Sequence, residues 1–151
     1  MPPAIHRVAA RVILIDPAGR TLLFLGGDPH RPQDGTWWFT PGGGVDEGET
    51  LDQAARREVL EETGISLRTL GDPVFCRRIE FTFESARYDQ TEHFFVARVD
   101  AHPLDDSGWT DVERRSIFER RWWSLAELRS TRQTVHPDNL ADLLASAQRP
   151  R

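Results

Sequence analysis

Three glutamates near the middle of the chain could together hold a divalent metal ion. Glu58, Glu61 and Glu62 lie in a stretch that we expect to be helical, and at about 100° per residue their side chains fall within one arc. Like charges at these spacings destabilise a helix by roughly 0.2–0.5 kcal/mol per pair, so a bound cation would offset their repulsion. Convergent carboxylate oxygens suit Mg²⁺ or Mn²⁺, whereas zinc prefers His or Cys, and neither occurs between Gly43 and Ile65.

The residues around these acids favour a phosphate ligand for the metal. Leu51, Ala54 and Val59 fall on the side of the helix that carries the glutamates, so the acids border the stripe that faces the core. The preceding glycines, Gly42 to Gly44, have no side chains to keep backbone groups away from a phosphate or a metal. An acidic cluster beside a glycine loop therefore predicts a site for a metal-bridged phosphate.

The stretch from Gly43 to Ile65 resembles a complete Nudix box. Its fixed positions are, in chain order, Gly43, Glu49, Arg57, Glu58, Val59, Glu61, Glu62, Gly64 and Ile65. The resemblance implies an enzyme in which water cleaves a nucleoside diphosphate linked to another group, with divalent metal ions on the phosphates. In that family Glu49 helps to hold the loop, although here it could equally be a first-turn acid favoured by the helix dipole.

The resemblance also implies roles for individual residues. The implied metal ligands are Gly43, through a backbone oxygen, and Glu58, Glu61 and Glu62. The implied catalytic residues are Arg57, Glu58 and Glu61, with Arg57 orienting a carboxylate through its rigid fork. Glu58 is the general base within the box, but some relatives take the base from a later loop. The later candidates are Glu92, Asp111, Glu113 and Glu119.

Four residues outside the box are candidates for substrate binding. Arg7 and Arg11 alternate with apolar residues in the first strand and could face the site, or lie at an exposed sheet edge. Trp38 precedes the glycine loop and could line a base pocket, or pack in the core. Glu92 begins a later strand, where its carboxylate could also reach the metal.

The whole-chain properties are those of a globular protein with one domain, residues 1–151. The chain has 38% hydrophobic and 28% charged residues and a net charge of −5. Such a charge argues against polymeric nucleic acid as a partner, while a small nucleotide can still bind through its metal. We expect no membrane span and no secretory signal, and a single cysteine, Cys76, fits the cytoplasm. The oligomeric state stays open, a homodimer included.

The order of the expected elements predicts an α/β (α+β) fold. We expect strands over 5–16, 21–25, 36–39, 76–83, 91–99 and 117–123, with a loop over 26–35, a turn over 85–89 and a loop over 101–110. Short helices should follow Ser124, which begins a capping box, and Pro137. These elements suit an α/β/α sandwich with a mixed β-sheet, which is also the fold that the Nudix resemblance implies.

The sequence thus predicts a Mg²⁺- or Mn²⁺-dependent pyrophosphohydrolase, with a (d)NTP or an oxidised nucleotide as substrate. The ADP-ribose type carries a proline where this chain has Glu80, and the dinucleoside polyphosphate type a tyrosine where it has Phe81 and Thr82. Alternatives are a pyrophosphatase for ADP-ribose, nucleotide sugars or dinucleoside polyphosphates, and a non-catalytic Nudix-like ligand sensor. The acidic charge counts against an enzyme for RNA ends.

Overall fold

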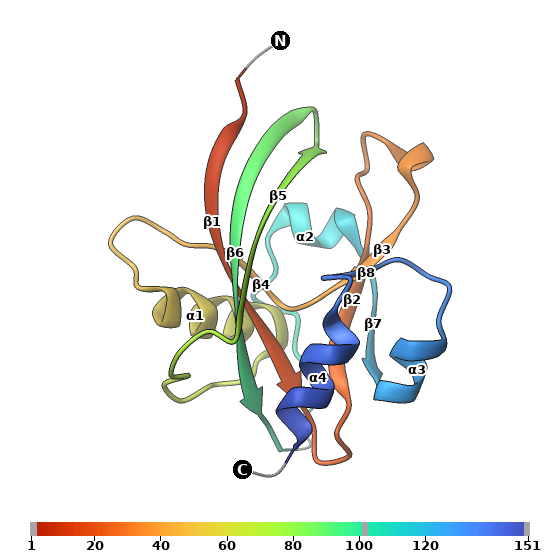
Figure 1. Cartoon of the computed structure of the whole chain (residues 1–151). Helices are drawn as coiled ribbons and strands as arrows, with labels where there is room; N and C mark the ends of the chain where they lie inside the picture. The colour runs from red at the N-terminus through yellow and green to blue at the C-terminus, as the bar shows by residue number, and fades with distance from the viewer. Residues whose placement is uncertain (1–2, 101–102, 150–151) are drawn as a thin grey trace.

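The structure is a computed structural model that describes residues 3–100 and 103–149 (Figure 1). Within these ranges the strands are β1 (Ile5–Ile15), β2 (Thr21–Gly26), β3 (Trp37–Phe39), β4 (Gly42–Gly44), β5 (Phe75–Phe83), β6 (Ala86–Arg98), β7 (Ile117–Trp123) and β8 (Val135–His136). The helices are α1 (Leu51–Thr63), α2 (Asp111–Ser116), α3 (Leu125–Ser130) and α4 (Leu140–Gln148), and a 3₁₀ turn covers Pro32–Asp34.

All the strands join one mixed sheet in which β1 is central. The order along the sheet is β5-β6-β1-β2-β3-β8, with β4 paired to β1 and β7 paired to β2. β1 runs parallel to β6 over its whole length, from Ile5 opposite Tyr88 to Ile15 opposite Arg98. It pairs with β2 only at Ile15 and Thr21, so the two halves of the sheet separate beyond that point. Residues 40–44 fill one side of this gap, because β4 pairs with β1 there.

The sheet lies between two helical layers, and β1 shows why. Its even-numbered residues Ala10, Val12 and Leu14 belong to the core cluster under α1. Its odd-numbered residues Ile13 and Ile15 belong to a second cluster with residues of α4. Both faces of the strand are buried, as a continuous apolar run predicts. Figure 1 accordingly shows α1 and α4 on opposite sides of the sheet.

Helix α1 begins and ends at residues suited to those positions. The Thr50 side chain accepts a hydrogen bond from the Gln53 N–H, and the Gln53 side chain accepts one from the Thr50 N–H, which completes a capping box. Gly64 ends the helix in the left-handed conformation, at φ 78°, which favours glycine. The helix therefore stops directly after the acidic residues that the box supplies.

The expected mixed sheet between helices is confirmed, and one expected turn is wrong. We expected a turn over 85–89, but only Glu84 and Ser85 turn, with φ of 46° and 68°. The following residues already belong to β6, because Tyr88 and Asp89 pair with β5 and β1 on either side. Strand β4 and helix α2 were not expected. Part of the expected loop over 101–110, residues 101 and 102, lies outside the described residues.

Among the described residues, no helix is both long enough and apolar enough to cross a bilayer. The sequence expectation of a single domain over residues 1–151 stays a prediction.

Candidate active site

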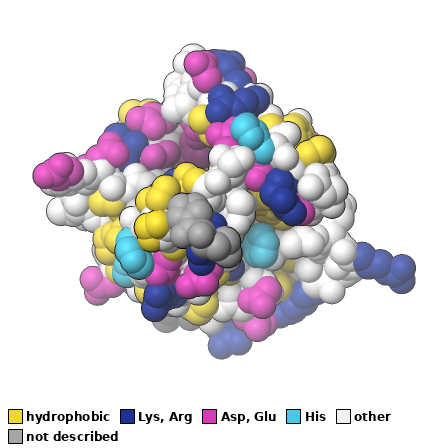
Figure 2. Space-filling view, turned by 90° about the horizontal axis from the view of Figure 1, so that it is seen from above, with side chains coloured by type: hydrophobic (Ala, Val, Ile, Leu, Met, Phe, Trp, Pro, Cys, Tyr) yellow, Lys and Arg dark blue, Asp and Glu magenta, His cyan; other side chains and the backbone are white. Residues whose placement is uncertain are grey.

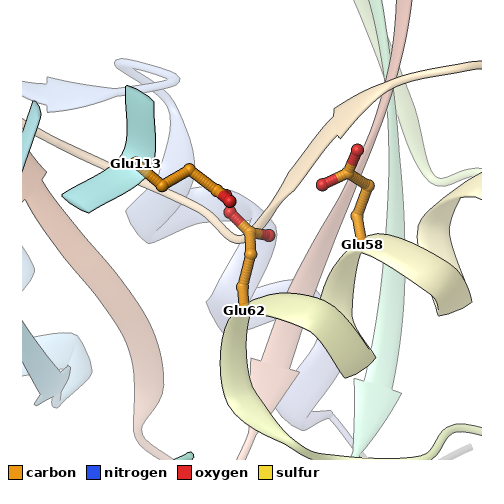
Figure 3. A group of neighbouring side chains, drawn as sticks. All are labelled: Glu58, Glu62 and Glu113. Atoms are coloured by element: carbon orange, nitrogen blue, oxygen red, sulfur yellow. The ribbon is translucent and has the colours of Figure 1, made fainter. Parts of the chain in front are cut away.

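Three carboxylates from two helices converge at one point. Glu58 and Glu62 come from α1 and Glu113 comes from α2, and each offers an oxygen within 4.8 Å of the others. Figure 3 shows the three side chains pointing toward one another, with Glu62 between the other two. In the space-filling view, acidic side chains gather around a hollow on the upper face of the molecule (Figure 2).

Strand β4 holds the two α1 acids in place. The Gly42 N–H donates a 2.7 Å hydrogen bond to Oε1 of Glu62. A Cβ on Gly43 would lie 2.6 Å from Cδ of Glu58, so this carboxylate rests directly against the Gly43 backbone. Only glycine allows such an approach. The two glycines thus fix where both carboxylates lie.

A loop packed on the end of α1 brings Glu113 into the cluster. The Asp105 N–H donates to the Thr63 carbonyl at 2.9 Å, and Nε1 of Trp109 donates to the Glu62 carbonyl at 2.8 Å. A Cβ on Gly108 would lie 2.6 Å from the Glu61 carbonyl oxygen, so loop and helix are in close contact. α2 starts right after this loop.

Glu113 also belongs to the capping box of α2. Its Oε1 accepts a hydrogen bond from the Thr110 N–H, and its own N–H donates to Oγ1 of Thr110. The cap fixes the side chain with one oxygen bonded to the backbone. From the sequence, Glu113 was a candidate only for the general base. The Thr-x-x-Glu pattern of residues 110–113 is the signal that could have revealed both α2 and the fixed carboxylate.

The surroundings of the cluster disfavour the ionised forms of Glu58 and Glu62. Burial raises the pKa of Glu62 well above its usual value, and the charges of Glu58 and Glu113 raise it further. Burial likewise raises the pKa of Glu58, although Arg57 opposes this shift. Three anions so close together need a cation to be ionised at once. Their donor set consists of oxygens alone, which fits a hard divalent ion such as Mg²⁺ or Mn²⁺.

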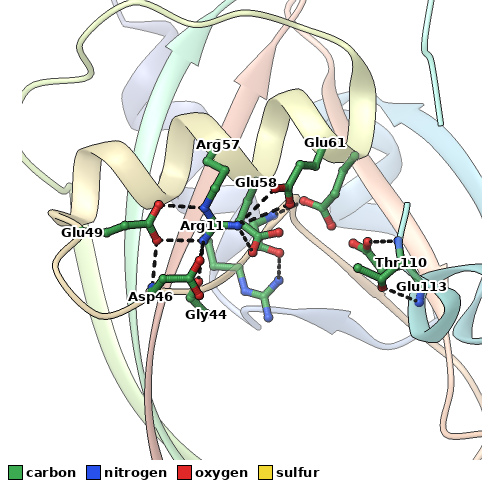
Figure 4. Close-up of polar contacts among 11 residues, drawn as sticks. Arg11, Gly44, Asp46, Glu49, Arg57, Glu58, Glu61, Thr110 and Glu113 are labelled. Atoms are coloured by element: carbon green, nitrogen blue, oxygen red, sulfur yellow. Dashed lines mark hydrogen bonds and ion pairs between the residues drawn. The ribbon is translucent and has the colours of Figure 1, made fainter. Parts of the chain in front are cut away.

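Arg57 organises the outer side of the cluster (Figure 4). It donates two hydrogen bonds to Glu49, at 2.7 and 2.8 Å, one to the Gly44 carbonyl at 3.0 Å and one to Oε1 of Glu58 at 3.0 Å. The Glu49 side chain therefore bonds to Arg57, and this lowers the Glu49 pKa to about 2. Glu61, whose side chain is 38% exposed, faces Arg57 at 3.3 Å and lies outside the close group.

The candidate substrate residues Arg11 and Glu92 bond to each other. Nε of Arg11 donates to Glu92 at 2.9 Å, and Arg77 donates to the other oxygen of Glu92 at 2.6 Å. Burial acts to raise the pKa of Glu92, but the attraction of Arg11 and Arg77 outweighs it and lowers the pKa. A carboxylate paired in this way is a weak base, and it is not one of the three converging acids.

The other residues that the sequence suggested for substrate binding or as the general base lie in different environments. Arg7 is exposed and lies over the Tyr88 ring at 5.3 Å. Trp38 is only 2% exposed and stacks edge-on against Trp123 in the core, so its indole does not line an open pocket. Asp111 and Glu119 are exposed and outside the acidic cluster.

The chain and its fold are similar to known proteins. The family model of the NUDIX domain matches residues 5–144. The structure of a MutT protein from Methanosarcina mazei Go1 superposes with a TM-score of 0.67, covering 97% of this chain and 95% of that chain at 22% identity. Identity this low shows a common fold and nothing more.

Two curated relatives extend the comparison. An RNA pyrophosphohydrolase of Caulobacter vibrioides is 49% identical over 67 residues, which are 44% of this chain and 37% of that protein, so the chain spans little more than a third of its length. An oxidized purine nucleoside triphosphate hydrolase of Danio rerio is 44% identical over 116 residues, which cover 74% of this chain and 70% of that protein.

Proposed function

Because the chain belongs to the Nudix family, we propose that it is a pyrophosphohydrolase that hydrolyses nucleoside triphosphates, oxidised purine nucleotides included. The reaction depends on Mg²⁺ or Mn²⁺ held by Glu58, Glu62 and Glu113. The observation that carries this proposal is the convergence of three buried or half-buried carboxylates, each with an oxygen within 4.8 Å of the others.

The protein's own groups have separate tasks in this proposal. Glu58, Glu62 and Glu113 would hold a divalent ion, and such an ion would supply positive charge to the phosphate oxygens and make the phosphorus more electrophilic. Glu58 accepts a proton from the attacking water as the general base. The water oxygen bonds to one phosphorus, and the bridging oxygen leaves with the other phosphate. Arg57 orients the Glu58 carboxylate through the hydrogen bond between them.

Arg7 is the cation that we assign to the substrate phosphates. It lies near Gly44, where a Cβ would be 3.6 Å from its Nε, and it makes no ion pair within the described part of the chain. Arg11 differs because its donors already bond to Glu92 and to backbone carbonyls. Glu61 would then help through Arg57 instead of binding the metal directly.

The preference for an oxidised purine nucleotide rests on the Danio rerio relative, whose match covers the larger share of both chains. The Caulobacter vibrioides relative favours a second substrate, the triphosphorylated 5′ end of RNA. The protein has a net charge of −5, and RNA binding gains affinity from basic surfaces, so the free nucleotide is the better candidate.

The test is hydrolysis measured on a substrate panel with Mg²⁺ or Mn²⁺. The panel contains dNTPs, 8-oxo-dGTP, 5′-triphosphorylated RNA, ADP-ribose, nucleotide sugars and dinucleoside polyphosphates. We expect metal-dependent release of pyrophosphate, with the highest kcat/KM on an oxidised or ordinary nucleoside triphosphate. A preference for RNA ends or ADP-ribose would replace the substrate assignment. Measurable metal binding without turnover on any substrate would favour the ligand sensor.

A further inference from the structure

A chain of charged hydrogen bonds runs from the middle of the sheet to the acidic cluster. Glu92 on β6 is 3% exposed and receives hydrogen bonds from Arg77 on β5 and Arg11 on β1. The side chain of Gln90 donates a third, at 3.1 Å. This carboxylate is therefore fully engaged inside the protein and is closed to a substrate.

Arg11 continues the chain toward the glycine strand. While its Nε bonds to Glu92, its Nη1 donates to the carbonyl of Gly42 at 3.1 Å and to that of Thr40 at 3.3 Å. Its side chain is only 14% exposed. The planar guanidinium can satisfy these acceptors together because its donors lie in a rigid fork.

Gly42 is the last step before the acids. Its carbonyl accepts from Arg11, and its N–H donates to Oε1 of Glu62 at 2.7 Å. The Gly42 backbone packs directly against β1, since a Cβ on Gly42 would lie 2.2 Å from the Ala10 carbonyl oxygen. Because Arg11 bonds to the carbonyl of the residue whose N–H bonds to Glu62, we expect a change in the Arg11 contact to shift that N–H.

We propose that Arg11 and Glu92 are positioning residues: acting through the Gly42 carbonyl, they hold the backbone that orients Glu62, and they thereby set the affinity of the acidic cluster for a divalent ion. The proposal rests on the proposed function, since it names the support of that same site. It also replaces substrate contact as the role of both residues. Supporting contacts of this kind typically change metal affinity by about 10- to 100-fold when removed.

The same sheet contains a second ion-pair cluster that serves as a control. Three residues before Glu92 on β6, Asp89 bonds to Arg78 of β5 at 2.7 and 2.5 Å, and His6 of β1 lies 3.1 Å from the same carboxylate. Asp89 is 7% exposed, which is comparable to Glu92, whereas the Arg78 side chain is 68% exposed against 14% for Arg11. This second cluster joins the same three strands, but none of its contacts reaches residues 40–44. It therefore reports the cost of disturbing such an ion pair without disturbing the site.

The decisive comparison is Arg11→Lys against Arg78→Lys. Lysine keeps the positive charge beside each carboxylate but loses the fork, so it cannot bond to Glu92 and to two carbonyls at once. The first readout is hydrogen exchange of the Gly42 amide, measured by NMR on the metal-free protein. We expect the Gly42 amide to exchange at least about tenfold faster in Arg11→Lys than in the wild type, which is the size of effect that losing a hydrogen bond to a charged group would have. In Arg78→Lys the amide should exchange at close to the wild-type rate.

The second readout is Mn²⁺ affinity without substrate. We expect binding at least about tenfold weaker in Arg11→Lys and unchanged in Arg78→Lys. Turnover lost in Arg11→Lys at low Mg²⁺ should return as Mg²⁺ is raised, with KM for the nucleotide little changed. A raised KM that Mg²⁺ does not restore would overturn the proposal, because it would indicate substrate contact.

The two proposals fail in different ways. A wild-type protein that binds no Mn²⁺ would overturn the proposed function and this inference with it. Wild-type binding, with the same affinity and the same Gly42 exchange in Arg11→Lys, would overturn the inference alone. If Arg11→Lys does not fold, Glu92→Gln with Asp89→Asn as its match makes the same comparison from the acidic side.

Discussion

At the scale of single residues, the proposed metal binding depends on the burial and the charged neighbours of each glutamate. Glu62 is 2% exposed and lies beside two other carboxylates, whereas Glu61, the preceding residue, is half-exposed and pairs with Arg57. Two neighbouring glutamates of one motif therefore have different surroundings. Burial and like charges make an ionised Glu62 destabilising in the metal-free protein, and a bound cation would offset this destabilisation.

Glu62→Gln should separate binding from folding. The amide keeps an oxygen for the Gly42 N–H but removes a buried charge that Glu58 and Glu113 repel. We expect Mn²⁺ binding and metal-dependent turnover to be lost, while the metal-free variant resists urea at least as well as the wild type. Glu61→Gln is the control and should retain most of the affinity. Wild-type turnover of Glu62→Gln at saturating Mg²⁺ would contradict the assigned site.

Glu49 should make stability depend on pH in the acid range. The hydrogen bonds from Arg57 lower the Glu49 pKa from 4.5 to about 2, so the ionised form favours folding. The contribution of Glu49 to the free energy of unfolding is complete above pH 4.5 and disappears as the pH falls through about 2. Urea unfolding should show Glu49→Gln less stable than the wild type at pH 7, with the difference shrinking below pH 4.5. Glu47→Gln, which is exposed, controls for the loss of one acidic charge, and a pH-independent difference would count against this explanation.

At the scale of elements, strand β4 and the loop before α2 decide the site. β4 is three glycines paired to β1, and its lack of side chains lets α1 approach from one side. The loop of residues 103–110 is bonded to the end of α1 and delivers Glu113 from α2. Neither element looks structured in the sequence, yet together they assemble the three acids.

The β4 glycines offer a matched pair of substitutions. In Gly43→Ala the new Cβ would lie 2.6 Å from Cδ of Glu58, so the carboxylate must move, while in Gly44→Ala the nearest atom is 3.6 Å away. We expect Gly43→Ala to fold normally but bind Mn²⁺ about tenfold more weakly, because only the end of a flexible side chain is displaced. Gly44→Ala should bind as the wild type does. Equal affinities in calorimetric titrations of the two variants would contradict this account of Glu58.

At the scale of the whole molecule, the two core clusters have separate tasks. The cluster under α1 supports the acidic site, and the cluster under α4 closes the opposite face of the sheet. Leu144 belongs to the second cluster and is fully buried. The sheet lies between this residue and the proposed metal ligands, so stability and metal binding should respond independently to changes here.

Leu144→Ala tests this independence. Truncating a fully buried leucine leaves a cavity and should lower the free energy of unfolding by about 2–5 kcal/mol, measured with urea. Mn²⁺ affinity of the folded variant should equal that of the wild type. Leu143→Ala, at a half-buried position on the same helix, should cost less stability. A large loss of metal affinity in Leu144→Ala would show that the two layers are coupled.

The sequence by itself determined the features that depend on nearby residues. The box spacing identified Glu58 and Glu62, the Ser124 capping box identified the start of α3, and apolar alternation identified most strands. Helical periodicity, caps and strand patterns are local, so a single sequence carries them.

Only the tertiary structure decided which distant groups meet. Glu113 joins Glu62 because a loop packs on α1, and Arg11 meets Glu92, 81 residues away, because β1 and β6 are parallel neighbours. Trp38 is buried because it packs against Trp123 of β7 in the core cluster that includes Leu140 and Leu144 of α4. Such contacts depend on strand order and loop packing, which no local pattern encodes. The sequence therefore predicted the chemistry of the acids, while the fold selected their third member and their support.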